Sequence, residues 1–139
     1  MVEKYFKITI PLLFLAIMLT AVSCQDGQQT SGTLQGTINI GPIWPVERPG
    51  ENPPVPQQVF EGRKVVVYNQ SQTKIVKTID LTQIAQSSKA SYSTQLKPGR
   101  YVVDINHIGI DSASEVPKKV EIKPGQTVTV DIDIDTGIR

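Results

Sequence analysis

The stretch YSTQLKPGRYVVDINH, residues 92–107, decides the fold of this chain. Two runs that alternate apolar and polar residues flank Lys97-Pro98-Gly99, where proline presets φ for a tight turn and glycine accepts a positive φ at the next corner. Side chains two residues apart share one face of a strand. One such face holds Ala90, Tyr92, Thr94 and Leu96 before the turn and Tyr101, Val103 and Ile105 after it. We therefore expect a central hairpin of a β-sandwich with one face in water.

The composition favours a single all-β domain. The chain has 139 residues, and its ten glycines and ten prolines punctuate short β-branched runs. Further alternating runs lie at 33–40, 63–68, 74–81, 118–123 and 127–135. Seven strands at this spacing predict a seven-stranded antiparallel β-sandwich over residues 33–139.

Residues 1–23 have the features of a secretory signal. Two lysines precede a run at 8–22 that is apolar apart from two threonines, and this run is shorter than the roughly 20 apolar residues that span a bilayer. The sequence TAVSC at 20–24 resembles the lipobox of bacterial lipoproteins, in which small residues precede a cysteine that receives lipid and becomes the new N-terminus. The resemblance implies a cleaved lipoprotein signal peptide, with lipidation at Cys24. The alternative is a plain secreted protein with an unused cysteine.

The stretch 24–32 is expected to be a lipidated cysteine and a flexible tether. Residues 25–32 are small and polar, and at ~3.3 Å per residue they reach at most about 26 Å. Two acyl chains suffice for stable anchoring. We expect an exported protein, held by lipid at a membrane of the bacterial cell envelope. In a Gram-negative cell, Gln25 directly after the lipidated cysteine, in place of an aspartate, resembles the signal that directs lipoproteins to the outer membrane.

The net charge argues against nucleic acid as a partner. Removing the leader leaves 14 − 2 = 12 basic and 13 − 1 = 12 acidic side chains. Binding to phosphate backbones needs a basic surface that displaces counterions. A domain near zero charge is therefore expected to bind no nucleic acid.

A proline-rich loop at 41–56 is the best candidate for a binding surface. It holds six of the ten prolines, and loops of this length without secondary structure are often functional. Trp44, the only tryptophan, lies within it between Ile43 and Pro45. The segment Ile43-Trp44-Pro45 predicts a platform for a sugar or a peptide. The alternative is that Trp44 folds back and plugs one end of the small core.

The last run carries aspartates on one face, at 131, 133 and 135. Same-face neighbours on a strand lie about 6.6 Å apart, whereas calcium needs six to eight oxygens at about 2.3–2.6 Å, so a straight ladder cannot converge on one ion. We expect a solvated face and no metal. If Ile122 pairs with Val128, Lys119 falls opposite Asp131 as an ion pair.

We expect no catalytic residue and no cofactor. His107 is the only histidine, the sequence has no hydrolase or phosphate-binding motif, and Cys24 is assigned to lipid. A hydrogen-bonded structural role suits His107 better than catalysis. Arg63, Lys64 and Arg139 are interpreted as rim charges rather than an anion site.

The sequence resembles a known family over residues 33–135. LKPGRYVV at 96–103, the strand around Gly36 and the paired runs at 118–123 and 127–132 are similar to the carboxypeptidase regulatory-like domain. That resemblance implies a prealbumin-like (transthyretin-like) or Ig-like sandwich, grouped with carbohydrate-binding-like folds, and a noncatalytic module. The chain is also similar to collagen-adhesin B-type repeats, but its first strand lacks the lysine, and its last strand the asparagine, of their isopeptide bond.

Two hypotheses of function remain. The first is an interaction or accessory module of the cell envelope, anchored by lipid on Cys24, that binds an envelope protein. The second is a carbohydrate- or peptidoglycan-binding module that uses the Trp44 loop. A hydrolase is a third, disfavoured reading, because no nucleophile and base are recognisable. A groove lined by Trp44 and polar side chains would favour the second hypothesis, and a flat apolar patch would favour the first.

Overall fold

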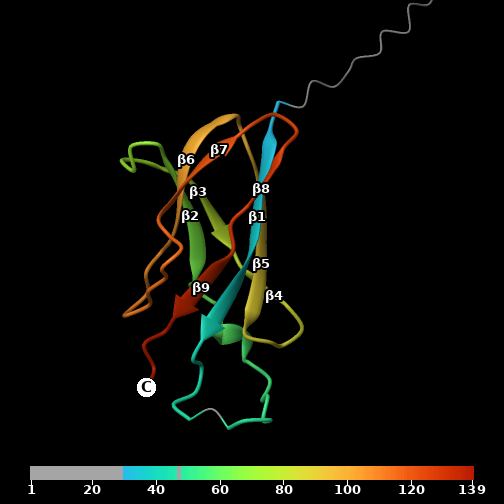
Figure 1. The fold of residues 1–139 in the computed structure, drawn as a ribbon, viewed down its shortest axis with the longest axis vertical. Coiled ribbons are helices and arrows are strands. Elements are labelled where there is room, and N and C mark those ends of the chain that lie inside the picture. Colours follow the sequence, from blue (N-terminus) through green and yellow to red (C-terminus); the bar gives the residue numbers. More distant parts are fainter. Residues whose placement is uncertain (1–29, 47) are drawn as a thin grey trace, which may run out of the picture.

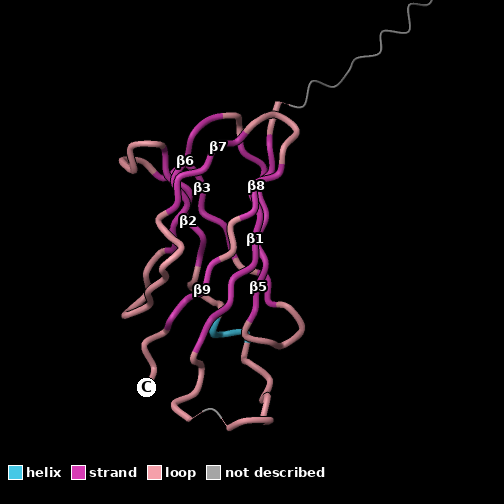
Figure 2. The backbone as a smooth tube through the Cα atoms, viewed as in Figure 1, coloured by secondary structure: helices cyan, strands magenta, loops and turns pink. Residues whose placement is uncertain are grey.

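The computed structural model describes residues 30–46 and 48–139, and it shows two packed β-sheets (Figure 1). The predicted leader and Cys24 lie outside the described residues. Strands and connecting loops make up nearly all of the described chain, with one short helical turn (Figure 2). No helix in this part of the chain is long and apolar enough to cross a membrane.

The described residues form nine strands, where the sequence predicted seven. One sheet contains β1 (Gly32–Gly41), β4 (Thr82–Gln83), β5 (Lys89–Leu96), β8 (Thr127–Thr129) and β9 (Ile132–Asp135). The other, in the order β3-β2-β6-β7, contains β2 (Lys64–Asn69), β3 (Ile75–Asp80), β6 (Gly99–Ile105) and β7 (Lys118–Ile122). The short 3-10 helix η1 (Gln57–Val59) precedes β2. A β-sandwich is therefore confirmed, but the strand count was wrong.

The predicted alternation places the core correctly in β1. Leu34, Ile38 and Ile40 are fully buried between the sheets, while the alternate residues Gln35, Thr37 and Asn39 are exposed. The core as a whole draws on both sheets: Leu34, Ile38, Ile40, Val65, Val67, Ile79, Ala90, Tyr92, Leu96, Val103, Ile105, Val120, Ile122, Val130, Ile132 and Ile134. Val66 and Val102 are also buried although they belong to the outward face of their sheet, so that face is not entirely wet.

The predicted central hairpin was wrong. β5 pairs with β1 and β4 in one sheet, whereas β6 pairs with β2 and β7 in the other. Lys97 and Pro98 therefore carry the chain from one sheet to the other instead of closing a hairpin. The second Lys-Pro-Gly, at 123–125, does the same between β7 and β8, so the predicted pairing of Ile122 with Val128 was also wrong. Alternation shows which face of a strand is buried but not which strand lies beside it.

The prediction of purely antiparallel sheets was wrong as well, because β8 and β9 both pair with β1 in parallel. The predicted single strand at 127–135 breaks at Val130-Asp131, opposite Gly36 and Thr37 of β1. A Cβ on Gly36 would lie 1.9 Å from the Val130 carbonyl oxygen, so only glycine lets the chains approach this closely. The close approach of Val130 to β1 requires the glycine.

Two side chains replace the ladder hydrogen bonds at this break. The Tyr92 hydroxyl donates to the Val130 carbonyl at 2.5 Å. The Thr37 backbone N–H and hydroxyl donate to the Asp131 carboxylate at 2.8 and 2.9 Å. The interruption therefore leaves these backbone groups satisfied.

The two ends of the sandwich differ in their connections. At the end where β1 begins, the connections are the short segments 70–74, 97–98 and 123–126, and we call it the turn end. At the end where β1 finishes, the segments 42–63, 84–88, 106–117 and 136–139 gather, and we call it the loop end (Figure 1). The ten residues of β1 run from one end to the other, about 33 Å at ~3.3 Å per residue.

Candidate functional site

The loop end contains a groove between the proline-rich loop and the turn that precedes β5. Its volume is about 690 Å³. Its walls combine an aromatic ring, several prolines and polar side chains, contributed by Ile43, Trp44, Val46, Arg48, Pro49, Glu51, Asn52, Pro53, Val55, Ala85, Gln86, Ser87 and Ser88. Aromatic and apolar walls with a few polar groups are typical of small-ligand sites.

Backbone hydrogen bonds hold the two walls together. The Val55 N–H donates to the Gln86 carbonyl at 2.9 Å. The Gln83 side-chain amide donates to the carbonyls of Val55 and Ser87, at 2.8 and 3.1 Å. The base of the groove is thereby formed without a ligand, so binding would require little ordering of these segments.

The turn from Ile84 to Ser87 has an uncommon backbone. Ser87 N–H donates to the Ile84 carbonyl at 3.0 Å, and the two central residues, Ala85 and Gln86, have φ of 46° and 53°. Residues other than glycine and asparagine are uncommon in this left-handed region. The strain lies directly at the groove, which is where strained backbone is often found to serve function.

The predicted platform residues Ile43, Trp44 and Pro45 lie at this end, but they do not act together. Ile43 packs partly against the core, and Trp44 is 40% exposed. Both line the groove, whereas Pro45 is exposed and does not. Ile43 therefore packs against the core, whereas part of the Trp44 side chain remains exposed.

Sequence reasoning missed the second wall. Gln86 and Ser87 read only as part of a polar connector, and nothing in their spacing connects them to Trp44. The pairing of the strands, once known, reveals the second wall. Because β5 is antiparallel to β1, the segment before β5 must lie beside the segment after β1. The register pairs Asn39 with Lys89, and the Ile40 N–H donates to the Ser88 carbonyl at 2.9 Å.

The charged residues considered for anion binding are each engaged with an acid. Arg63 makes a two-pronged ion pair with Asp111, with Nε 2.7 Å from Oδ2, and both side chains are largely buried. The side chains of Lys64 and Arg139 contact Asp80 and Asp135, respectively. These contacts neutralise the three cations that a bound anion would need.

His107 lies on the surface with its Nε2 3.0 Å from Asp104 Oδ1 and its Nδ1 3.5 Å from the Asp111 carbonyl. Its side chain is half exposed, and its backbone has a φ of 40°. The ring is therefore held between Asp104 at the end of β6 and the Asp111 carbonyl of its own loop.

The aspartates of the last run stand along the edge of a sheet, since β1 is the only strand that pairs with β8 and β9 within the described residues, and Asp135 is bridged in addition to Ser112 of the preceding loop. Hydrogen bonds from Thr37 lower the pKa of Asp131, and those from Arg139 and the Gly137 N–H lower the pKa of Asp135. Lys119 pairs across the sheet with Val102, so the expected Lys119–Asp131 pair was wrong. Within 30–46 and 48–139, no three acidic, histidine or cysteine side chains are placed to share a metal ion.

Comparisons with known proteins identify no family for this chain. No protein-family model matches it, and a search of curated proteins finds no match. Among solved structures, the minor pilin GBS52 of the Gram-positive pathogen Streptococcus agalactiae is 16% identical over 77% of this chain and 45% of its own, with a TM-score of 0.44. A leucine-rich repeat protein from Bacteroides thetaiotaomicron is 14% identical over 78% of this chain and 14% of its own, with a TM-score of 0.33. This chain thus spans less than half the length of either protein, and at these TM-scores neither likeness bears on function.

Proposed function

We propose that this chain is a noncatalytic, lipid-anchored binding module of the bacterial cell envelope, and that it holds a carbohydrate in the Trp44 groove. The observation that carries the proposal is the partly exposed indole of Trp44 beside polar side chains, in a groove at the end of the domain away from the tether. The carboxypeptidase regulatory-like resemblance, with its carbohydrate-binding-like fold, agrees with this proposal.

The chemistry of the groove suits a sugar. An indole face stacks on the C–H groups of a pyranose ring, while amide and hydroxyl groups pair with its hydroxyls. Asn52, Gln86 and Ser87 supply such groups among the residues that line the groove. Arg48 and Glu51, 3.7 Å apart and exposed, add one charge of each sign and so select no strongly charged ligand. We therefore favour a neutral glycan or a neutral segment of the cell wall.

The binding proposal is tested by thermal unfolding with neutral oligosaccharides and soluble cell-wall fragments. A ligand at 100 times its Kd adds about 2.7 kcal/mol, which is several degrees for a domain of this size. We expect a saturable rise in melting temperature that Trp44→Ala abolishes. Ile110→Ala is the matched control, because Ile110 is 73% exposed at the same end but lies outside the groove.

Two results would contradict the carbohydrate proposal: no shift with any sugar, or a shift that Trp44→Ala retains. The first would favour the broader alternative, an accessory module that binds an envelope protein. A large loss of melting temperature in Trp44→Ala without ligand would instead support the plug interpretation.

The anchoring proposal has a separate test. Cys24→Ala should prevent labelling with a fatty-acid probe in cells and release the protein from the membrane fraction. Continued membrane retention of the Cys24→Ala protein would contradict it.

A further inference from the structure

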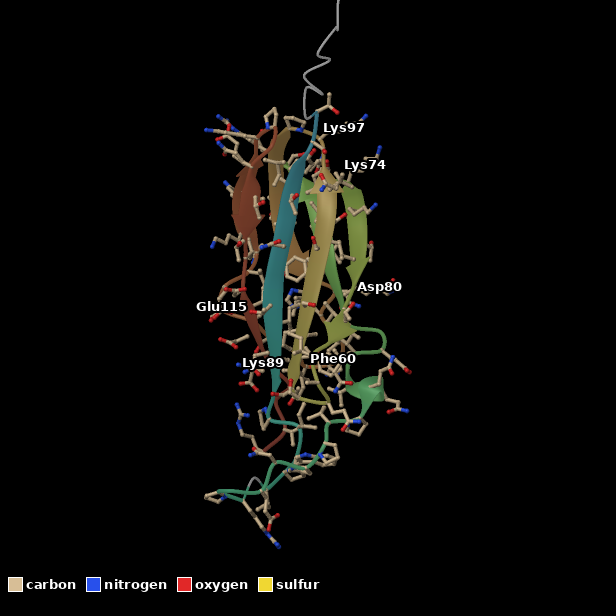
Figure 3. The ribbon with its side chains drawn as sticks, turned by 90° about the vertical axis from the view of Figure 1, so that its right-hand side faces the viewer. Phe60, Lys74, Asp80, Lys89, Lys97 and Glu115 are labelled. Carbon is tan, nitrogen blue, oxygen red and sulfur yellow. The ribbon has the colours of Figure 1, made fainter. Side chains whose placement is uncertain are left out.

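Every connection at the turn end carries one lysine and no acid. The segments 70–74, 97–98 and 123–126 contain Lys74, Lys97 and Lys123, and all three side chains are exposed. Figure 3 shows Lys74 and Lys97 at the end of the sandwich where β1 begins. Three elements that are distant in sequence therefore place positive charge at the same end of the domain, and we call these three lysines the lysine cap.

The ion pairs of the described residues lie at the other end. All five of them involve residues in or beside the loop-end segments: Arg48–Glu51, Arg63–Asp111, Lys64–Asp80, His107–Asp104 and Arg139–Asp135. Within residues 30–46 and 48–139, none joins a lysine of the cap to an acid. The lysines of the turn-end connections thus form no ion pair with the described residues, whereas most of the cations at the loop end do.

The N-terminal segment joins the domain at the same end as the lysine cap. The turn that holds Lys123 bonds directly to this segment, since the Gly125 N–H donates to the Ser31 carbonyl at 2.9 Å and the Thr33 N–H donates to the Gln126 carbonyl at 2.8 Å. The tether between Cys24 and β1 reaches at most about 26 Å. If Cys24 carries lipid, the surface nearest to the bilayer is the lysine cap.

We propose that the lysine cap binds an anionic lipid surface and thereby orients the domain, with the groove turned away from the membrane. Each lysine close to an anionic bilayer strengthens binding by roughly fivefold. The attraction fades within a Debye length of about 8–10 Å, so charges at the loop end, about 30 Å away, do not contribute. A short tether raises the effective concentration of the lysine cap at the membrane surface, so a weak attraction is enough to orient the domain. The physiological orientation rests on the proposed anchoring at Cys24, but the affinity of the cap does not.

The test uses the soluble domain from Gln25 to Arg139, which carries no lipid. The buried core of the described residues lies between Leu34 and Ile134, so the soluble domain keeps all of it. We expect it to co-sediment with vesicles that contain 30% phosphatidylglycerol in phosphatidylcholine at low salt, to be released at high salt, and not to bind pure phosphatidylcholine vesicles. Neutralising the cap with Lys74→Gln, Lys97→Gln and Lys123→Gln should weaken binding by about 100-fold, from roughly fivefold per lysine.

The matched control neutralises three lysines away from the cap, Lys64→Gln, Lys89→Gln and Lys118→Gln, and it changes the net charge equally. It should bind anionic vesicles like the parent. Equal losses in the two triple variants, or no preference for anionic vesicles, would overturn the proposal. Binding of a short DNA duplex as tight as that of the vesicles would also overturn it, because the cap would then select phosphate density rather than a lipid surface. None of these outcomes depends on Cys24, whose role is judged by the fractionation of Cys24→Ala.

Discussion

The charged side chains at the turn end and at the loop end of this sandwich differ in their exposure and in their partners. At the loop end, cations and acids are paired, and Arg63 and Asp111 form a largely buried ion pair that ties the segment before β2 to the loop after β6. At the turn end, three exposed lysines project from tight turns. Charges that hold a fold together are desolvated and paired, whereas charges available to a partner remain in water. The contrast separates structural charges from recognition charges within a domain of almost zero net charge.

The largest expected effect is at the buried pair. Arg63→Ala leaves the Asp111 carboxylate buried without its partner, and removing one member of such a pair costs about 3–5 kcal/mol. Urea unfolding should show this loss, whereas Lys97→Ala at the turn end should change stability by less than about 0.5 kcal/mol. Similar effects at both positions would remove the distinction between the two ends.

The next effect concerns the strand that joins the two ends. Gly36→Ala forces a methyl group toward the Val130 carbonyl oxygen, and overpacking of this kind costs about 1–3 kcal/mol. Gly41→Ala is the matched control in the same strand, since a Cβ there meets no atom within 4 Å. Thermal unfolding of both variants measures the difference. A Gly36→Ala protein as stable as Gly41→Ala would contradict the account of the β8–β9 break.

A smaller effect compares two glutamines with nearly equal backbone angles, one at each end. Gln86 at the groove has a φ of 53°, and Gln72 at the turn end has a φ of 56°. Glycine relieves left-handed strain but loses more backbone entropy on folding, so each substitution should change stability by no more than about 1 kcal/mol. Oligosaccharide affinity should fall in Gln86→Gly alone. An equal loss in Gln72→Gly would show that the groove is not the binding site.

The smallest effect is a pH dependence at Asp131. Hydrogen bonds from Thr37 hold the pKa of Asp131 below its unfolded value of 3.8. The folded state therefore binds fewer protons, so this contribution to stability is present above about pH 4 and is lost as the pH falls below it. Urea titrations should show that the Asp131→Asn protein is less stable than the parent at pH 5, and that this difference in the free energy of unfolding becomes smaller as the pH drops to 2. Asp133→Asn serves as the control, because the Asp133 side chain makes no hydrogen bond to the described residues. A stability difference between Asp131→Asn and the parent that stays constant with pH would contradict the prediction.

The sequence predicted the local part of this fold well. Alternation identified the strands around Leu34, Val65 and Val103, and it assigned the buried faces of the first and the last, because burial of one face has a period of two residues. It did not predict that the Lys-Pro-Gly turns cross between sheets, since a turn motif bends the chain in the same way whether the next strand is a neighbour or lies opposite. The parallel pairing of β8 and β9 depends on Gly36, whose role appears only when Val130 is placed beside it.

The candidate site was predicted in the same partial way. Trp44 stood out because it is a single aromatic residue in a proline-rich loop, but the wall that faces it comes from residues 84–88. The lysine cap could not be recognised from total charge, because summing charges over the chain erases their separation in space. The information that joins 70–74, 97–98 and 123–126 is the register of the strands between them.

The most direct test of the account uses the native fluorescence of Trp44, the only tryptophan in the chain. The soluble domain is bound to anionic vesicles that contain brominated lipids, which quench nearby indoles, and acrylamide is then added to the water. If the lysine cap faces the membrane and the groove faces outward, brominated lipids leave the emission of Trp44 unchanged and acrylamide quenches it as fully as in free protein. Quenching by the brominated lipids together with protection from acrylamide would place the groove in the bilayer and contradict the account.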